Sequence, residues 1–218
     1  DGTLIVAISQ SGETADLLAA MRVAKERGEV HILALCNVAH STLTREADLL
    51  ALTQAGIEVG VASTKAFTTQ LAALFTLAGT LAQVRQTLAK DDIQTLANWL
   101  PRLPAMLSEI LPLENQIEVW AHELSHYDHA LFLGRNTLFP IALEGALKLK
   151  EIAYIHAEGY AAGELKHGPL ALVDENMPVI VCAAHDELFD KLLSNIREVE
   201  ARGGKIYLIA EPGCEAAY

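Results

Sequence analysis

The chain has 218 residues, of which 51% are hydrophobic and 20% are charged, and its formal net charge is −12. So apolar a sequence can bury a large core, which excludes intrinsic disorder as the default. The acidic balance argues against a nucleic-acid surface, which needs clustered Lys and Arg. It leaves room for an anionic small molecule, because exposed charges are screened beyond about 8 Å at physiological salt.

Apolar runs of strand length alternate with amphipathic runs of helix length along the chain. Strands are predicted at 4–8, 30–36, 48–52, 130–133, 179–183 and 205–210. Helices are predicted at 15–27, 63–88, 91–111, 113–125, 141–154 and 188–202, with breaks at Pro101, Pro104 and Pro112. Strands separated by helices of this length pair in parallel through crossovers, so the pattern predicts a doubly wound α/β fold.

Two of these helices carry further expectations. Gly28 follows the first helix and is expected to cap it in the left-handed conformation. The helix at 63–88 is mostly apolar, so we expect it to be buried on several sides. Its longest apolar stretch, 66–82, is interrupted by threonines and a glutamine, and we expect it to be too short and too polar for a membrane span.

Three cysteines, Cys36, Cys182 and Cys214, make no even disulfide framework. The first two end apolar runs and are expected to be buried thiols in a reducing compartment, which indicates the cytoplasm. The sequence opens directly into a strand, without the pattern of a secretory signal. We therefore expect a cytoplasmic protein with neither a membrane nor a nucleic acid as partner.

The order strand, loop, helix, glycine, strand over 3–36 recurs over 177–210. Any two strand–helix–strand units look alike, but the similar lengths favour a duplicated domain. We expect a first domain at 1–88, a helical linker at 89–121 and a second domain at 122–218. Both domains are expected to be truncated, because a doubly wound sheet usually has about five strands.

The loop at 9–14 reads Ser-Gln-Ser-Gly-Glu-Thr and joins the first strand to the first helix. Open α/β sheets bind ligands at the carboxyl ends of their strands, and a helix N-terminus presents unpaired N–H groups to anions. Gly12 permits close backbone approach, and Ser9, Ser11 and Thr14 add hydroxyl donors. The loop lacks a Walker lysine and the dinucleotide glycine spacing, so it predicts a phosphomonoester site. The alternative is a plain capping loop with Ser11 or Thr14 as the N-cap.

The segment His122-Glu123-Leu124-Ser125-His126 matches the zinc-protease pattern H-E-x-x-H. Zinc needs a third ligand, and Glu144 lies eighteen residues further on with no sign that it faces back. We therefore expect a solvated helix face here and no metal site.

Glu144, Lys148 and Glu151 fall on one stripe of an otherwise apolar helix, at about 100° per residue. Charges on a mostly buried helix cost free energy unless they are paired or functional, and a carboxylate beside an ammonium is a good proton-transfer pair. The alternative is a surface ion pair of Glu144 and Lys148, worth a few tenths of a kcal/mol. His167 precedes Gly-Pro in a glycine-rich loop; a lone histidine is more often structural, but an imidazole suits acid–base work near neutrality.

Together these motifs resemble one family, the glucosamine-6-phosphate synthases, whose isomerase half the chain resembles over essentially all its length. The matching segments are ISQSGET at 8–14, GVASTKAF at 60–67, ALEGALKLKEI at 142–152 and YIHAEGYAAGELKHGP at 154–169. The two long motifs are highly specific, whereas the first alone indicates only the wider sugar-isomerase superfamily. The resemblance implies two flavodoxin-like sugar-isomerase domains that need no cofactor.

The resemblance also implies a substrate and a set of residues that bind it. The substrate would be fructose 6-phosphate, converted with glutamine to glucosamine 6-phosphate for amino-sugar biosynthesis. Its phosphate would bind Ser9, Gln10, Ser11 and Thr14, and its sugar would contact Val61 and Ser63.

For catalysis, the resemblance implies that Glu151 moves a proton between C1 and C2 of the open-chain sugar and that Lys148 assists it. His167 would open the sugar ring in the site of the neighbouring subunit, so a homodimer is implied. A glutaminase domain would belong to the full-length protein.

Three parts of that family are not found in the sequence: the glutaminase domain, the start of the first sugar domain and the lysine-bearing tail. Lys205 opens a strand and is not expected to replace the lysine of that tail. We therefore expect that the chain alone does not make glucosamine 6-phosphate from glutamine. Two alternatives stay open: a non-catalytic phosphosugar-binding module, and a related phosphosugar isomerase or deaminase.

Overall fold

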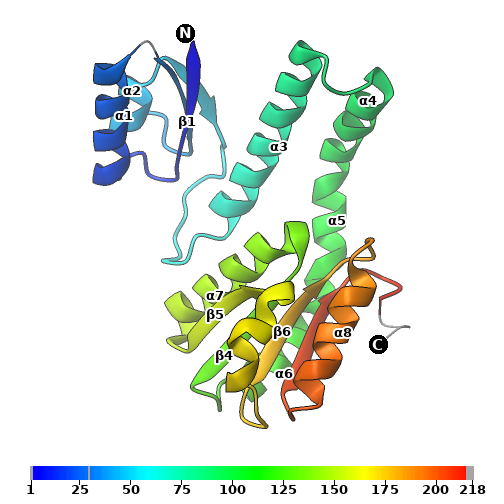
Figure 1. Ribbon diagram of the computed structural model, residues 1–218. Coiled ribbons are helices and arrows are strands. Elements are labelled where there is room, and N and C mark those ends of the chain that lie inside the picture. Colours follow the sequence, from blue (N-terminus) through cyan, green and yellow to red (C-terminus); the bar gives the residue numbers. More distant parts are fainter. Residues whose placement is uncertain (1, 29, 215–218) are drawn as a thin grey trace. The chain divides into compact units, whose positions relative to one another are not determined.

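The computed structural model describes residues 2–28 and 30–214. The chain divides into two compact units, Asp1–Glu109 and Ile110–Tyr218, and each contains one parallel sheet (Figure 1). The boundary falls inside the segment expected to be a helical linker. The α/β class predicted from the alternation of strands and helices is confirmed.

The first unit is built on a three-stranded parallel sheet with the order β1-β2-β3. Its first elements are β1 (Thr3–Ser9), α1 (Ala15–Arg27), β2 (Val30–Cys36), α2 (Thr42–Glu46) and β3 (Leu49–Leu52). Met21 of α1 packs with Ile32 and Ala34 of β2 in the core of this unit. Because Ser9 pairs with Cys36, and Cys36 with Leu52, the carboxyl ends of the three strands lie at one edge.

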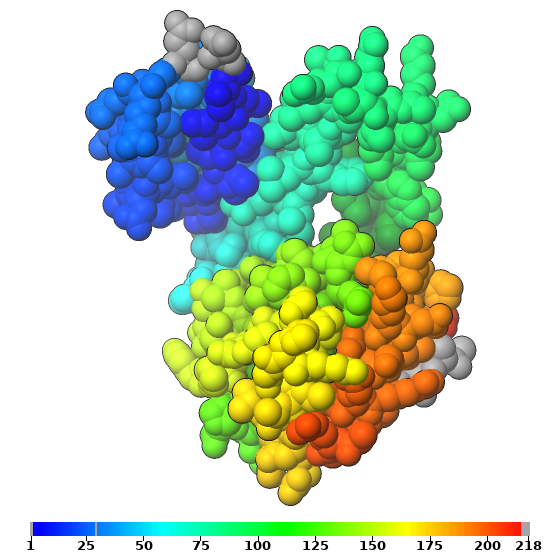
Figure 2. All heavy atoms as spheres, in the orientation of Figure 1, coloured from blue at the N-terminus to red at the C-terminus, as the bar shows by residue number. Residues whose placement is uncertain are grey.

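Three helices complete the unit: α3 (Lys65–Arg85), α4 (Lys90–Trp99) and α5 (Leu103–Ile110). The expectation that the long helix is buried on several sides was wrong. Ala66 is the one buried residue of α3, while Phe75 and Val84 are 42% and 74% exposed. Figure 2 shows this helix at the surface, in cyan.

α3 is also long and apolar enough, by length and composition, to cross a membrane. The expectation that it is too short and too polar was therefore wrong. Its threonines are less polar than they look, because Thr69, Thr76 and Thr80 donate their hydroxyls to backbone carbonyls of the preceding turn. Length and composition alone do not separate a span from a helix that packs against another part of a protein.

The second unit is built on a four-stranded parallel sheet with the order β5-β4-β6-β7. Its elements are α6 (Glu114–Leu124), β4 (His129–Gly134), α7 (Phe139–Ala153), β5 (His156–Ala161), β6 (Pro178–Ala183), α8 (Phe189–Glu200) and β7 (Lys205–Ala210). All residues of β6 are buried, and Leu192, Ile196 and Val199 of α8 pack in the same core as Val179 and Val181. Short 3-10 turns at Leu100–Arg102 and Leu111–Leu113 break the helices that precede this sheet, as Pro101 and Pro112 predict.

The sequence patterns missed two elements and misjudged one cap. α2 has only five residues, too few for a periodic signal. β5 carries His156, Glu158 and Tyr160, so it lacks the apolar run of a buried strand. Gly28 has φ 169°, an extended conformation, so the expected left-handed cap was wrong.

The repeat expected from the sequence is present as two strand–helix–strand units, β1-α1-β2 and β6-α8-β7. In each unit the two strands are hydrogen-bonded neighbours and run parallel.

Cys36 and Cys182 are buried, as expected, and burial raises the pKa of the Cys182 thiol. At this pKa Cys182 behaves as a packed apolar side chain and not as a thiolate nucleophile.

Candidate functional site

The loop between β1 and α1, residues 9–14, lies at the carboxyl end of β1. Gly12 has φ +69°, which favours glycine, and an added Cβ there would collide with the side chain of Ser41. The Ser9 hydroxyl is buried and accepts a hydrogen bond of 2.9 Å from the Gly12 N–H. The Ser11 hydroxyl accepts one of 3.2 Å from the Glu13 N–H. The loop is therefore folded tightly by two of its own hydroxyls.

Thr14 occupies the N-cap position of α1, but its side chain makes no capping hydrogen bond. The first N–H groups of a helix have no partner within the helix. In α1 the Thr14 hydroxyl accepts no hydrogen bond from them. Gln10 and Ser11 are half-buried, and Thr14 is exposed. The four residues expected to bind phosphate thus lie in the loop that leads into the N-terminus of α1.

The loop after β3 carries the two residues expected to contact the sugar. Val61 is 94% exposed and Ser63 is half-buried. The Glu58 carboxylate accepts hydrogen bonds of 3.3 and 3.1 Å from the N–H groups of Thr64 and Ala66 at the start of α3. Glu58 therefore fixes the end of this loop, a role that the sequence analysis did not identify.

The charged stripe on α7 is present as predicted. Lys148 Nζ lies 2.7 Å from Glu144 Oε1 and 3.3 Å from Glu151 Oε2, and all three side chains are 22–35% exposed. The ion pair named as the alternative exists, but a second carboxylate shares the ammonium. Burial opposes the charge on Lys148, yet the hydrogen bonds that Lys148 donates to the Glu144 and Glu151 carboxylates outweigh it and raise the pKa of Lys148. Lys148 is therefore a cation at neutral pH.

His167 ends a 3-10 turn, Ala162–His167, and its side chain is exposed. Gly168 follows with φ +151° and ψ −58°, and Pro169 begins the next turn. The adjacent Lys166 is anchored by an ion pair of 2.8 Å with Glu198 of α8. The histidine is thus presented to solvent from a turn that is fixed on both sides.

In the H-E-x-x-H segment, the glutamate is engaged by two residues of β7. The Glu123 carboxylate accepts hydrogen bonds of 2.6 Å from Lys205 and 2.9 Å from Tyr207, and the pKa of Glu123 is lowered by these bonds. The rings of His122 and His126 lie 5.2 Å apart at the end of α6. Over residues 2–28 and 30–214, no three His, Cys, Asp or Glu side chains are arranged to hold a metal ion.

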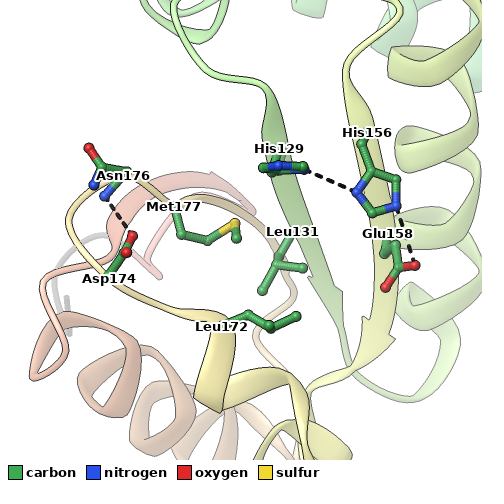
Figure 3. A pocket seen from close by; sticks show the side chains of 9 residues that line it. His129, Leu131, His156, Glu158, Leu172, Asp174, Asn176 and Met177 are labelled. Carbon is green, nitrogen blue, oxygen red and sulfur yellow. Dashed lines mark hydrogen bonds and ion pairs between the residues drawn. The ribbon is translucent and has the colours of Figure 1, made fainter.

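A separate pocket of about 360 Å³ lies near the amino ends of β4 and β5 (Figure 3). His129 Nδ1 lies 3.1 Å from His156 Nδ1, and His156 Nε2 lies 3.6 Å from the Glu158 carboxylate. Asp174 and Met177 line the facing wall. None of the residues expected to act in catalysis lines this pocket.

The chain is similar to proteins of a known family. The sequence profile of the SIS domain family matches residues 1–79 and 123–213. The chain is 54% identical over 209 residues to the glutamine–fructose-6-phosphate aminotransferase (isomerizing) of Haemophilus influenzae, covering 96% of this chain and 34% of that protein. The chain thus spans about a third of the length of the curated relatives it matches.

Many solved structures are similar to the chain, including the following two. One is the C-terminal domain of glucosamine-fructose-6-phosphate aminotransferase from Francisella tularensis, with a TM-score of 0.96, 48% identity and coverage of 99% of this chain and 61% of that one. The other is glucosamine-6-phosphate deaminase from Thermotoga maritima, with a TM-score of 0.78, 25% identity and coverage of 98% and 62%.

Proposed function

The chain belongs to the SIS domain family, and from this premise we propose that it is the isomerase portion of a glutamine–fructose-6-phosphate aminotransferase (isomerizing). The observation that carries the proposal is the loop at 9–14, which gathers hydroxyls at a helix N-terminus left open by its own N-cap residue. The identity of 54% over 96% of the chain to a protein of that name supports the choice of substrate.

In this function the loop binds the phosphate of fructose 6-phosphate through Ser9, Gln10, Ser11 and Thr14. Hydrogen bonds to a charged acceptor contribute about 1.5–3 kcal/mol each, which outweighs the long-range repulsion from a net charge of −12. Val61 and Ser63 contact the sugar. The phosphate anchors the substrate, and the sugar contacts select among phosphosugars.

Glu151 acts as the base that moves a proton between C1 and C2 of the open-chain sugar. Its carboxylate is held next to the Lys148 cation, which stabilises the negative charge that develops on the sugar oxygen. His167 opens the ring by exchanging protons with the anomeric hydroxyl and the ring oxygen, and it acts across a homodimer. The full-length protein adds a glutaminase domain, and we place it in the cytoplasm with no cofactor.

A titration of the chain with fructose 6-phosphate, and with fructose as the comparison ligand, tests the binding step. Calorimetry is expected to show binding that requires the phosphate and that Ser11→Ala and Thr14→Ala each weaken by about tenfold, roughly one charge-assisted hydrogen bond. Equal affinity for fructose and its phosphate contradicts the proposal.

The similarity to a glucosamine-6-phosphate deaminase supports a second candidate, a phosphosugar deaminase. The two activities differ in the nitrogen donor. If the full-length protein forms glucosamine 6-phosphate only when glutamine is supplied, it is the aminotransferase. If it releases ammonia from glucosamine 6-phosphate in the absence of glutamine, it is the deaminase. A protein that binds phosphosugar and does neither is a binding module.

A further inference from the structure

Glu13 is a carboxylate in the middle of a loop proposed to bind a phosphate. Its Oε1 atom accepts a hydrogen bond of 2.7 Å from the N–H of Thr42, the first residue of α2. This backbone hydrogen bond lowers the pKa of Glu13, so the group is ionised at neutral pH. The carboxylate is therefore bonded to α2, the helix that follows β2, the strand next to β1 in the sheet.

The backbone of the same loop is attached to the same segment. The Leu43 N–H donates to the Gly12 carbonyl at 3.0 Å, and the Asn37 N–H donates to the Gln10 carbonyl at 3.3 Å. With the Glu13 contact, three hydrogen bonds join residues 10–13 to residues 37–43. We name residues 37–43 the brace segment.

The brace segment also holds the loop that leads to the expected sugar contacts. The Asn37 side-chain amide donates to the Gly56 carbonyl at 2.7 Å, and its oxygen accepts from the Ala55 N–H at 2.8 Å and from the Thr53 hydroxyl at 3.1 Å. Asn37 thus bonds the phosphate loop through its backbone and the 53–56 loop through its side chain. Asn37 therefore sets the distance between the phosphate loop and the 53–56 loop.

Buried side chains hold the brace segment in place. The Ser41 side chain is buried and accepts from the Thr44 N–H at 3.4 Å, and Cys36 Sγ lies 3.6 Å from Ser41 Oγ. Both side chains touch the space where a Cβ on Gly12 would lie. The loop can therefore rest directly on the brace segment only because residue 12 has no side chain.

We infer that Glu13 and Asn37 are positioning residues: through the brace segment they hold the phosphate loop and the sugar loop in their ligand-binding arrangement. The inference rests on the proposed function and deepens it. It explains why an acidic residue sits beside a phosphate site. The carboxylate is bonded to a backbone N–H of α2, and this bond fixes the loop more strongly than the charge repels the ligand.

Substitution of Glu13 separates positioning from simple charge repulsion, because the two predict opposite signs. If Glu13 only repels phosphate, Glu13→Ala strengthens fructose 6-phosphate binding. If Glu13 positions the loop, Glu13→Ala weakens it by about tenfold, whereas Glu13→Gln, which keeps the acceptor oxygen and removes the charge, binds at least as tightly as the wild type. An affinity of Glu13→Ala equal to or above that of Glu13→Gln overturns the inference.

Glu26→Ala is the matched control, since it removes one exposed carboxylate from the last turn of α1 and changes the net charge equally. It is expected to leave the affinity unchanged. Asn37→Ala is expected to weaken fructose 6-phosphate binding more than Glu13→Ala, because it frees the 53–56 loop as well. Unchanged affinity in Asn37→Ala contradicts the role given to that residue.

Hydrogen exchange on the ligand-free chain distinguishes failure of this inference from failure of the proposed function. Glu13→Ala is expected to speed exchange of the Thr42 amide at least tenfold, while amides in the core of β2 are unchanged. If the wild type binds no fructose 6-phosphate but this amide responds, the proposed function fails and the brace stands. If the amide does not respond, the brace fails whatever the ligand.

Discussion

The units β1-α1-β2 and β6-α8-β7 have the same chain order and nearly the same lengths, yet they are buried to different extents. All six residues of β6 are buried, whereas Ala7 and Ser9 are the buried residues of β1. α8 buries six residues and α1 buries two. β6 pairs with strands on both sides, and β1 pairs with β2 alone among the described strands. Burial in these repeats is thus set by the neighbours of a strand and not by its own pattern.

The loops that follow the two strands differ in how they use a carboxylate. In the β6-α8-β7 repeat Asp186 accepts a hydrogen bond of 2.8 Å from the Leu188 N–H, within the loop that precedes α8. In the first unit the Glu13 carboxylate bonds to α2, and the start of α1 receives no side-chain cap. Neither helix has a side-chain cap, and the two carboxylates differ in that Asp186 bonds within its own loop whereas Glu13 bonds to a neighbouring element.

The largest effect is expected at Gly12. Gly12→Ala forces a side chain into a left-handed residue against the buried Ser41, so we expect a loss of about 2–4 kcal/mol in the free energy of unfolding and no measurable fructose 6-phosphate binding. Urea denaturation and calorimetry measure the two effects. Gly28→Ala is the control, because Gly28 is extended and has open space around its Cβ position, and it should change the stability by less than about 0.5 kcal/mol.

The difference in burial is sharpened by trimming one valine from each repeat. Val181 of β6 is fully buried and Val6 of β1 is half-buried, so we expect Val181→Ala to lower the free energy of unfolding by about 2–3 kcal/mol and Val6→Ala by about 1 kcal/mol. Urea denaturation of both variants is the measurement. Equal losses would mean that β1 is covered as completely as β6 in solution.

The difference between the loops is tested by Asp186→Ala. Loss of this hydrogen bond within the loop is expected to cost about 1 kcal/mol of stability and to leave fructose 6-phosphate affinity unchanged, because the second loop is not proposed to bind phosphate. Thermal unfolding of this variant measures the loss of stability, and calorimetry measures its affinity for fructose 6-phosphate. A loss of affinity at constant stability would give the second loop a part in the site.

The smallest effect is expected in the pH dependence of the first loop. The pKa of Glu13 is lowered from its ordinary value of 4.5 by the Thr42 hydrogen bond, so its carboxylate stabilises the folded chain at neutral pH and this contribution is lost as the pH falls through the lowered pKa. The difference in urea midpoint between wild type and Glu13→Gln is therefore expected to shrink as the pH falls below the ordinary value of 4.5 and through the lowered pKa. A difference that grows on acidification would contradict the assignment.

Much of the fold followed from the sequence because apolar runs and glycine breaks mark the strands and helices. β2 and α1 begin and end at the predicted residues. The burial of α3 was not predictable in this way, since an apolar pattern shows what a helix can cover but not which neighbour covers it. The edge strand β5 was missed because its polar face, with His156 and Glu158, resembles a loop.

Of the candidate site, the sequence identified side chains that carry chemistry but not those that hold them in place. The stripe of Glu144, Lys148 and Glu151 followed from helical periodicity alone. Asn37 and Glu58 gave no signal, because their hydrogen bonds reach segments that are distant in the chain. Contacts between the loops of adjacent strands depend on register, which residue types do not reveal.

The close approach of residue 12 to Ser41 has a consequence for how this protein can change by mutation. A side chain at position 12 meets another side chain, so its cost depends on what residue 41 is, and the two positions do not vary independently. Replacing Ser41 by glycine first should make Gly12→Ala less damaging, leaving the cost of the backbone conformation and of the contact with Cys36 Sγ. The order in which these two substitutions occur therefore decides whether the route passes through a folded intermediate.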